Sequence, residues 1–207
     1  MTTFNSREPN TFHYLTFVTF ARINIFRSSD ICQLFVDALN EVRAKRMFKL
    51  IAYVVMPDHV HMIINPLHCD IELVGKEIKG IAAKKILDWL KENGHKVSLE
   101  KLKLKKAGKR NHSYSVWQKK VKSVDLWSQK FVLQKRNYVH QNPVRAGLCS
   151  HPAEWKWSSY LAYVRPDSTG VPIEPDRPYY WTEEQLRAAG IVNFSAVKDR
   201  WLNGNDE

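Results

Sequence analysis

Two histidines separated by one residue, His59 and His61, are the first side chains in this 207-residue sequence whose spacing allows metal chemistry. Residues i and i+2 of a β-strand point to the same face, so the imidazoles would lie side by side while Val60 faces the opposite layer. Two adjacent imidazoles can chelate a divalent cation. The pattern alone is weak, because eight histidines make a chance pair unsurprising.

A tyrosine and an asparagine four residues apart, Tyr138 and Asn142, form the second candidate group. This spacing places both on one face of a helix. A phenol can attack a phosphodiester once its proton is removed or its charge is met by a metal, and an amide oxygen can be a ligand of a hard cation. The alternative is that Tyr138 is an ordinary amphipathic residue that packs against a sheet.

A basic segment between residues 96 and 110 is the third candidate, because seven Lys and Arg residues there face a single acid, Glu100. Three rings lie nearby in the sequence, at Tyr114, Trp117 and Trp127. Cations for phosphates interleaved with rings for bases are typical of single-strand binding surfaces, although a solvated loop would also explain the charge. The candidate DNA contacts are Lys101, Lys103, Lys105, Lys106, Lys109, Arg110, Trp117 and Arg145.

Alternating and helical patterns predict the elements that would position these residues. We expect strands at 12–20, 48–55, 59–65 and 114–117, with a tight turn at 56–58 that pairs the second strand with the third. Helices are expected at about 28–42, 71–92 and 128–141, the last ending before Pro143 because the residue before a proline avoids helical geometry. The order β-α-β-β-α-β is that of an α+β ferredoxin-like split βαβ fold, an antiparallel sheet with helices on one face.

The length suits one compact domain, which we place at residues 1–165, followed by a proline-rich linker and tail at 166–207. The longest apolar run, Leu50 to Met56, is far shorter than the roughly 20 residues that span a membrane, and no signal peptide is recognised. Three scattered cysteines favour a reduced, cytoplasmic protein. The net charge of +11 favours nucleic acid as the partner.

The stretch 52–64, AYVVMPDHVHMII, resembles the HUH signature strand pair of the REP-associated tyrosine transposases, relatives of the small single-strand insertion-sequence transposases. Residues 116–118 (VWQ) and 138–148 (YVHQNPVRAGL) resemble that family's tyrosine helix and its exit, and 155–160 (WKWSSY) is similar to the Trp-Ser-Ser element that follows. The match covers roughly residues 11–164 in the family's order, which makes the joint pattern far more specific than any single motif.

The resemblance implies a metal-dependent cleavage and rejoining of single-stranded hairpin DNA. His59, His61 and Asn142 would hold Mg²⁺ or Mn²⁺ against the scissile phosphate. Tyr138 would attack it, leaving a 5′-phosphotyrosine and a free 3′-hydroxyl. Gln141 is another possible amide ligand, although the family's spacing favours Asn142. His140 lies about 200° around the helix from Tyr138, so we do not expect it to be a ligand.

Two other functions remain open at this point. A catalytically silent DNA- or RNA-binding protein could keep the fold, although pure binding does not require the His-His-Tyr-Asn set. A metal-dependent hydrolase could use the histidine pair with water as nucleophile, but such enzymes usually need further His or Asp ligands, and no second cluster has suitable spacing. The sequence also leaves open whether the chain is a monomer or a homodimer, and whether the tyrosine serves its own or its neighbour's site.

Overall fold

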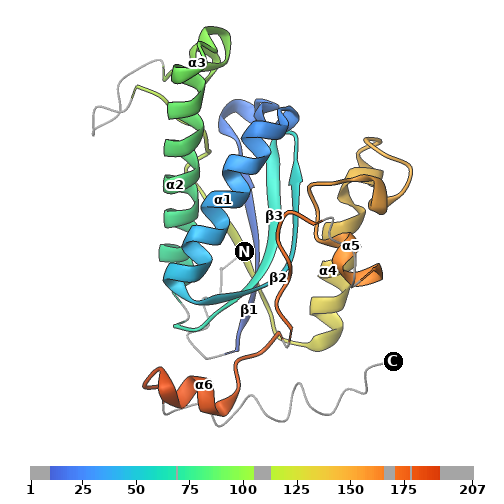
Figure 1. Cartoon of the computed structure of the whole chain (residues 1–207). Coiled ribbons are helices and arrows are strands. Elements are labelled where there is room, and N and C mark those ends of the chain that lie inside the picture. The colour runs from blue at the N-terminus through green and yellow to red at the C-terminus, as the bar shows by residue number, and fades with distance from the viewer. Residues whose placement is uncertain (1–9, 69, 105–112, 166–170, 178, 192–207) are drawn as a thin grey trace.

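Four strands form one antiparallel sheet in the spatial order β2-β3-β1-β4 (Figure 1). The computed structural model describes residues 10–68, 70–104, 113–165, 171–177 and 179–191. The strands are β1 (Phe12–Val18), β2 (Phe48–Met56), β3 (His59–Pro66) and β4 (Lys122–Leu126). The helices are α1 (Ser29–Arg46), α2 (Ile71–Glu92), α3 (Lys96–Leu102), α4 (Gln129–Arg145), α5 (Tyr160–Val164) and α6 (Glu183–Ala188).

The histidine pair belongs to β3, an inner strand that is hydrogen-bonded on both sides. His61 lies opposite Thr16 of β1 and Val54 of β2 in the antiparallel register. Because β1 and β2 both pair with β3, the register of β3 is fixed, and each of its side chains points to a defined face of the sheet. The hairpin predicted between the second and third strands is confirmed, with its turn at Pro57 and Asp58.

The two faces of the sheet are covered by different helices. Helices α1 and α2 pack on one face, and α4 covers the other (Figure 1). The first face supplies a large apolar core with α1 and α2, to which the strands contribute Leu15, Phe17, Leu50, Tyr53, Val55, Val60, Met62 and Ile64. The second face carries a smaller cluster with α4, which includes Tyr14, Ile63, Val132 and Val139. The expected α+β antiparallel fold is thus confirmed, but the helices are divided between both faces.

Local capping explains where the long helices begin. Ser28, Asp70 and Ser128 each accept a hydrogen bond from the backbone N–H three residues later, which satisfies one of the free donors at the first turn of α1, α2 and α4. Helix α2 also ends where the sequence predicts, at Asn93 and Gly94. Gly94 has a φ of 68°. That positive φ is a backbone region in which glycine carries no steric cost.

Two predictions from the sequence were wrong: the position of the fourth strand and the end of the tyrosine helix. The segment 114–117 forms only isolated bridges, with Lys103 and Thr19, and the fourth strand is the more polar Lys122–Leu126, which pairs with β1. Helix α4 continues through Pro143 to Arg145 instead of stopping before the proline. The ladder resumes at once, because the Ala146 N–H donates to the Asn142 carbonyl at 3.0 Å and the proline ring itself is buried.

The segment that follows α4 returns to cover the edge strand β2. The backbone of Val55 accepts from the Trp155 indole at 3.0 Å and donates to the Trp157 carbonyl at 2.8 Å, and Val54 forms a bridge with Ser158. Further along β2, the Leu50 N–H donates to the Asp176 carboxylate at 2.6 Å. These contacts occupy backbone groups that an exposed edge would offer to another chain.

Part of the region expected to be a linker packs on the domain. Ile173 is buried in the core with α1 and α2, and the Trp181 indole donates to the Asn65 carbonyl at 3.0 Å. The division of the chain at residue 165 stays an expectation. Within the described ranges, no helix combines the length and the apolar character needed to cross a bilayer.

Candidate active site

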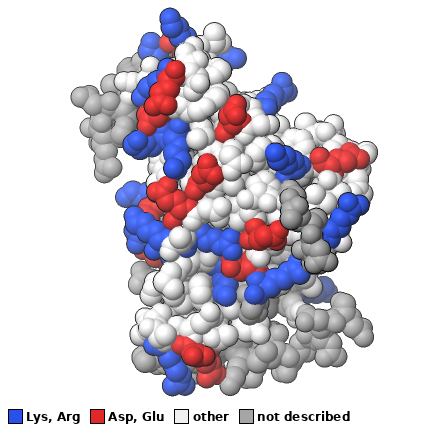
Figure 2. All heavy atoms as spheres, viewed as in Figure 1, with Lys and Arg blue, Asp and Glu red and all other residues white. Residues whose placement is uncertain are grey.

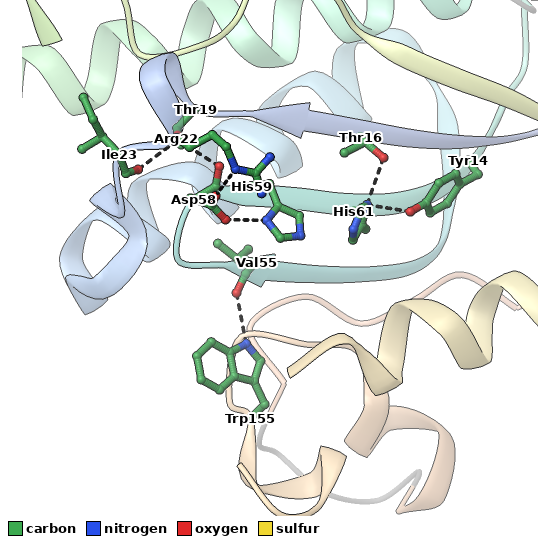
Figure 3. Close-up of polar contacts among 10 residues, drawn as sticks. All are labelled: Tyr14, Thr16, Thr19, Arg22, Ile23, Val55, Asp58, His59, His61 and Trp155. Carbon is green, nitrogen blue, oxygen red and sulfur yellow. Dashed lines mark hydrogen bonds and ion pairs between the residues drawn. The ribbon is translucent and has the colours of Figure 1, made fainter. Parts of the chain in front are cut away.

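The imidazoles of His59 and His61 lie next to each other on the face of the sheet that α4 covers. Their ring centroids are 4.7 Å apart and the ring planes are inclined by 74°. The alternation of β3 produces this arrangement, because Val60 between them is fully buried in the core on the other face. The expected side-by-side placement of the two rings is therefore what the structure shows (Figure 3).

The Nδ1 atom of His59 is held by Asp58, the residue before it, at 2.6 Å. The carboxylate is itself fixed by an ion pair with Arg22 at 3.0 Å, and the Asp58 carbonyl accepts from the Thr19 hydroxyl at 2.9 Å (Figure 3). A carboxylate only accepts hydrogen bonds, so it selects the His59 tautomer with the proton on Nδ1. The lone pair of Nε2 is then available to a ligand.

The Nδ1 atom of His61 contacts two hydroxyls, that of Tyr14 at 2.7 Å and that of Thr16 at 2.9 Å. Both residues belong to β1, the neighbouring strand, and both point to the same face of the sheet. Burial lowers the pKa of His61 to about 3, and the neighbouring His59 and Lys135 side chains lower it further. The imidazole is therefore neutral near pH 7, which is the form that binds metals.

Tyr138 of α4 lies against His61 in the same chain. The ring centroids of Tyr138 and His61 are 5.8 Å apart, and that of Tyr14 is 6.2 Å from Tyr138. Burial raises the pKa of Tyr14, and the neighbouring Tyr138 phenol raises it further. A half-buried tyrosine on a late helix is thus brought to the histidine pair by the packing of α4 on the sheet.

Asn142 lies one helical turn after Tyr138, as the spacing predicts. Its amide nitrogen donates to the Tyr138 carbonyl at 2.8 Å, so its side chain contacts its own helix. Within the described part of the chain, this hydrogen bond leaves the amide oxygen as the free end of the side chain. The role of Asn142 as a ligand stays a prediction.

Two cations lie against the ring of Tyr138. The Lys135 ammonium is 5.2 Å from the Tyr138 centroid and 4.9 Å from that of Tyr14, and the Arg145 guanidinium is 5.4 Å from the Tyr138 centroid. Arg145 was among the predicted DNA contacts, whereas Lys135 was missed. The signal that could have found Lys135 is its position three residues before Tyr138, on the same helix face.

Three other predicted DNA contacts, Lys101, Lys103 and Trp117, lie away from this group. Lys101 and Lys103 are exposed on or just after α3, which lies at the far end of α2 and away from α4 (Figure 1). Trp117 is only 6% exposed, packs against Phe17 and Phe26, and donates its indole N–H to the Lys79 carbonyl. Its ring cannot stack on a base from that position. Lys105, Lys106, Lys109 and Arg110 lie outside the described residues.

Surface charge does not mark the site by itself. Figure 2 shows Lys and Arg interspersed with Asp and Glu on the face it presents, so no continuous basic stripe is visible there. Several surface cations have carboxylate partners, such as Arg46 with Glu77 and Lys84 with Asp88. The local arrangement around Tyr138 is therefore more informative than the net charge.

His140, which was not expected to be a metal ligand, links α4 to the sheet. It is buried, and its Nε2 contacts the Ser159 hydroxyl at 2.9 Å. The same hydroxyl accepts from the Tyr53 N–H of β2 at 3.0 Å. This chain of contacts ties α4 to the sheet on the side away from Tyr138, and it gives the Trp-Ser-Ser element a function in positioning the helix.

The residues around the histidine pair suit a divalent cation with a mixed ligand set. Both Nδ1 atoms are hydrogen-bonded, so Nε2 is the ring nitrogen that each imidazole can offer to a cation. Within the described ranges, no group of three or more His, Cys, Asp or Glu is placed to hold a metal. Two imidazoles with amide, water or phosphate oxygens remain as donors, a set that Mn²⁺ and Mg²⁺ accept.

Comparisons with known proteins identify the family and the fold. A family model described as "Transposase IS200 like" matches residues 10–145, which include β1 to β4 and α4. A solved structure of a REP-associated tyrosine transposase bound to a REP hairpin is similar, with a TM-score of 0.58, 19% identity, and coverage of 88% of this chain and 98% of that one. At this identity the similarity shows a shared fold.

A second solved structure, of a Deinococcus radiodurans R1 protein proposed to be a transposase, has a TM-score of 0.41 and 18% identity. It covers 68% of this chain and 97% of that one, and its score is too low to add to the argument. No curated protein matches the chain significantly.

Proposed function

The chain belongs to the IS200-like transposase family, and from this membership and the site geometry we propose that it cleaves and rejoins single-stranded DNA through a phosphotyrosine at Tyr138. The observation that carries the proposal is the contact between the rings of Tyr138 and His61, at 5.8 Å between centroids. A phenol beside a pair of oriented imidazoles suits a metal-assisted attack on phosphate.

The proposed reaction exchanges one phosphodiester for another. The Tyr138 oxygen forms a bond to phosphorus while the bond from phosphorus to the 3′-oxygen breaks. The phenol gives up its proton and the departing 3′-oxygen gains one, so the products are a 5′-phosphotyrosine and a 3′-hydroxyl. The ester retains the energy of the original linkage, and attack by a 3′-hydroxyl reverses the step without another energy source.

The chain's own residues orient the reacting groups. Asp58 contacts Nδ1 of His59, and Tyr14 with Thr16 contact Nδ1 of His61, so both rings are oriented with Nε2 as the nitrogen left for a ligand. His59, His61 and Asn142 would hold Mg²⁺ or Mn²⁺, which would polarise the phosphate and offset the growing charge. Gln141 is exposed on α4 and is the second candidate for the amide ligand.

Hairpin-bearing single strands are the proposed substrate class. The similar REP-associated tyrosine transposase was solved with a REP hairpin, and the two chains share their fold. The strongly positive net charge of +11 supports a polyanionic partner. The cytoplasmic location, and the choice between monomer and homodimer, stay predictions.

Covalent capture tests this proposal. The unmodified protein and the Tyr138→Phe variant are incubated with Mn²⁺ and a 5′- and 3′-labelled pool of single-stranded hairpins, then denatured. We expect a protein–DNA adduct with the unmodified chain and a loss of more than about a thousandfold with Tyr138→Phe, because the nucleophile is absent. Sequencing the attached strands would identify the cleavage site.

Two results would contradict the proposal and separate it from its rivals. Binding of hairpins without any adduct, across Mg²⁺ and Mn²⁺, would favour a catalytically silent binding protein. Free cleaved strands without an adduct, formed equally by Tyr138→Phe, would favour a hydrolase that uses water. Retention of the fold in the variant is checked by its thermal melt, since only one hydroxyl is removed.

A further inference from the structure

An exposed aromatic pair lies at the start of α4. The Trp127 side chain is 63% exposed and stacks on Phe131, with ring centroids 5.2 Å apart and planes inclined by 17°. Three other tryptophans, Trp117, Trp155 and Trp181, each donate their indole N–H to a backbone carbonyl. Trp127 instead presents one large flat surface to solvent, and this is a costly arrangement without a partner.

Beyond this pair, the face of α4 that carries Tyr138 also carries cations that have no acidic partner among the described residues. Within the described residues, the contacts of Lys135 and Arg145 are with the aromatic rings described above, and neither cation has a carboxylate at ion-pair distance. Lys84 and Lys103, by contrast, are paired within their own helices or turns. Two unpaired cations beside Tyr138 therefore suit an anion that the protein does not itself supply.

A surface pocket of about 480 Å³ joins the aromatic and cationic residues. Phe131, Lys135, Tyr138 and Arg145 all line it. These positions are separated by four, three and seven residues, so they form one stripe along the helix. Tyr138 lies about 14 Å along the helix axis from Gln129, the first residue of α4, and Trp127 lies two residues before that start, so a few nucleotides can span the distance.

We propose that this stripe of α4 is the binding surface for the single-stranded segment that leads to Tyr138, with an unpaired base stacked on Trp127 and phosphates bound by Lys135 and Arg145. The inference rests on the proposed function, and it adds where the single strand binds and which of its groups, base or phosphate, each residue contacts. Single-stranded DNA is the occupant because stacking on a protein ring requires an unpaired base, and the cations require a polyanion. A base pair inside a duplex offers no free ring face.

Binding measurements can separate the stacking contribution from the charge contribution. All variants are made in the full chain that also carries Tyr138→Phe, so that no strand is consumed. Fluorescence anisotropy is measured with three fluorescein-labelled probes: oligothymidine, an abasic strand of the same length, and a blunt duplex. We expect oligothymidine to bind more tightly than the abasic strand, because only the former can stack.

Trp127→Ala should weaken oligothymidine binding by about 5- to 100-fold and remove most of the preference over the abasic strand. Trp127→Phe should restore a large part of both. Lys135→Gln should keep that preference but reduce the slope of log affinity against log salt by about 0.7, the value for one lost phosphate contact on a single strand, and Lys135→Arg should keep the slope. Lys76→Gln, an exposed lysine on α2 and the opposite face, is the matched control.

The proposal is overturned if Trp127→Ala and Lys135→Gln bind all three probes as Lys76→Gln does, or if the duplex binds as tightly as oligothymidine and depends equally on Trp127. Thermal melts identify any variant that fails to fold, and the phenylalanine and arginine variants then decide. Cleavage is scored separately in the chain with Tyr138 intact. If the preference for oligothymidine over the abasic strand depends on Trp127 but no adduct forms, the binding surface is supported and the proposed cleavage is contradicted. If an adduct forms but the preference does not depend on Trp127, the cleavage is supported and the binding surface is contradicted.

Discussion

The two faces of the sheet use the same strands for different purposes. On the α1 and α2 face, β1 and β3 contribute Leu15, Phe17, Val60 and Met62 to a dry apolar core. On the α4 face, the alternate positions are Tyr14, Thr16, His59 and His61, which hydrogen-bond to one another or to Asp58 (Figure 3). The polar set is thus built on a backbone that the other face holds in place.

This difference indicates how a rigid site is obtained from a small fold. Val60 is fully buried between two histidines that face the other way, so the core anchors the strand directly beneath the imidazoles. Burial of polar groups is costly unless they are hydrogen-bonded, and the α4 face meets that condition for both Nδ1 atoms. The apolar face should therefore determine stability, and the polar face should determine chemistry and acid sensitivity.

The largest expected difference between the faces is the effect of low pH on stability. The pKa values of His61 and His140, both on the α4 side, are lowered to about 3, chiefly by burial. The unfolded chain binds protons near pH 6.5 that the folded chain does not, so the stabilisation from neutral histidines is present above pH 6.5 and is lost as pH falls. We expect the free energy of unfolding, measured in urea with EDTA, to fall by about 3 kcal/mol from pH 7 to pH 5.

A matched variant tests whether the histidines cause this loss. His61→Gln removes one of the two groups on the α4 side and should flatten the pH dependence, while His13 and His140, whose pKa values are also lowered by burial, keep their share of it. An unchanged slope in that variant would assign the acid sensitivity to other groups and would weaken the division between the faces.

Truncation on the apolar face should affect stability alone. Val60→Ala removes two methyl groups from the core with α1 and α2, and we expect a loss of about 2 kcal/mol in the free energy of unfolding. Adduct formation below the melting temperature should stay within about twofold, because the β3 backbone and both imidazoles are retained. A Val60→Ala protein that is stable but unable to form adducts would show that the faces are not separable.

Asp58→Asn should have the smallest effect and should act on the polar face alone. An asparagine can present its amide N–H to the His59 Nδ1 and so favour the wrong tautomer, and we expect Mn²⁺ affinity to fall by about tenfold in calorimetry. Because Asp58 also pairs with Arg22, the control is Arg22→Gln, which loses the ion pair but keeps the carboxylate. Equal effects of the two variants would assign the loss to the turn rather than to the tautomer.

The sequence was sufficient wherever local spacing determines structure. The alternation at His59 to His61, the turn at Pro57 and Asp58, and the cap at Ser28 all depend on neighbours within a few residues, and each was predicted correctly. Tyr138 and His61 lie 77 positions apart in the chain but in contact in the structure. This contact was expected only because both residues belong to motifs of the family that the sequence resembles.

Long-range packing explains what the sequence did not reveal. Residues 114–117 have a strand-like composition, but the Trp117 ring is held by Phe17, Phe26 and Phe35, and the register with β1 selects the polar 122–126 instead. Pro143 is accommodated with its ring buried near the end of α4, a tertiary effect that outweighs a local preference. The roles of Tyr14 and Thr16 required the pairing of β1 with β3.

Helix α4 begins directly after β4, at one edge of the sheet, and the segment that follows it pairs with β2, at the other edge. A strand end carried by Tyr138 would therefore be attached in the middle of a helix whose two ends are fastened to opposite borders of the domain. If Tyr138 carries a strand end as proposed, a pull on that DNA would load both attachments together.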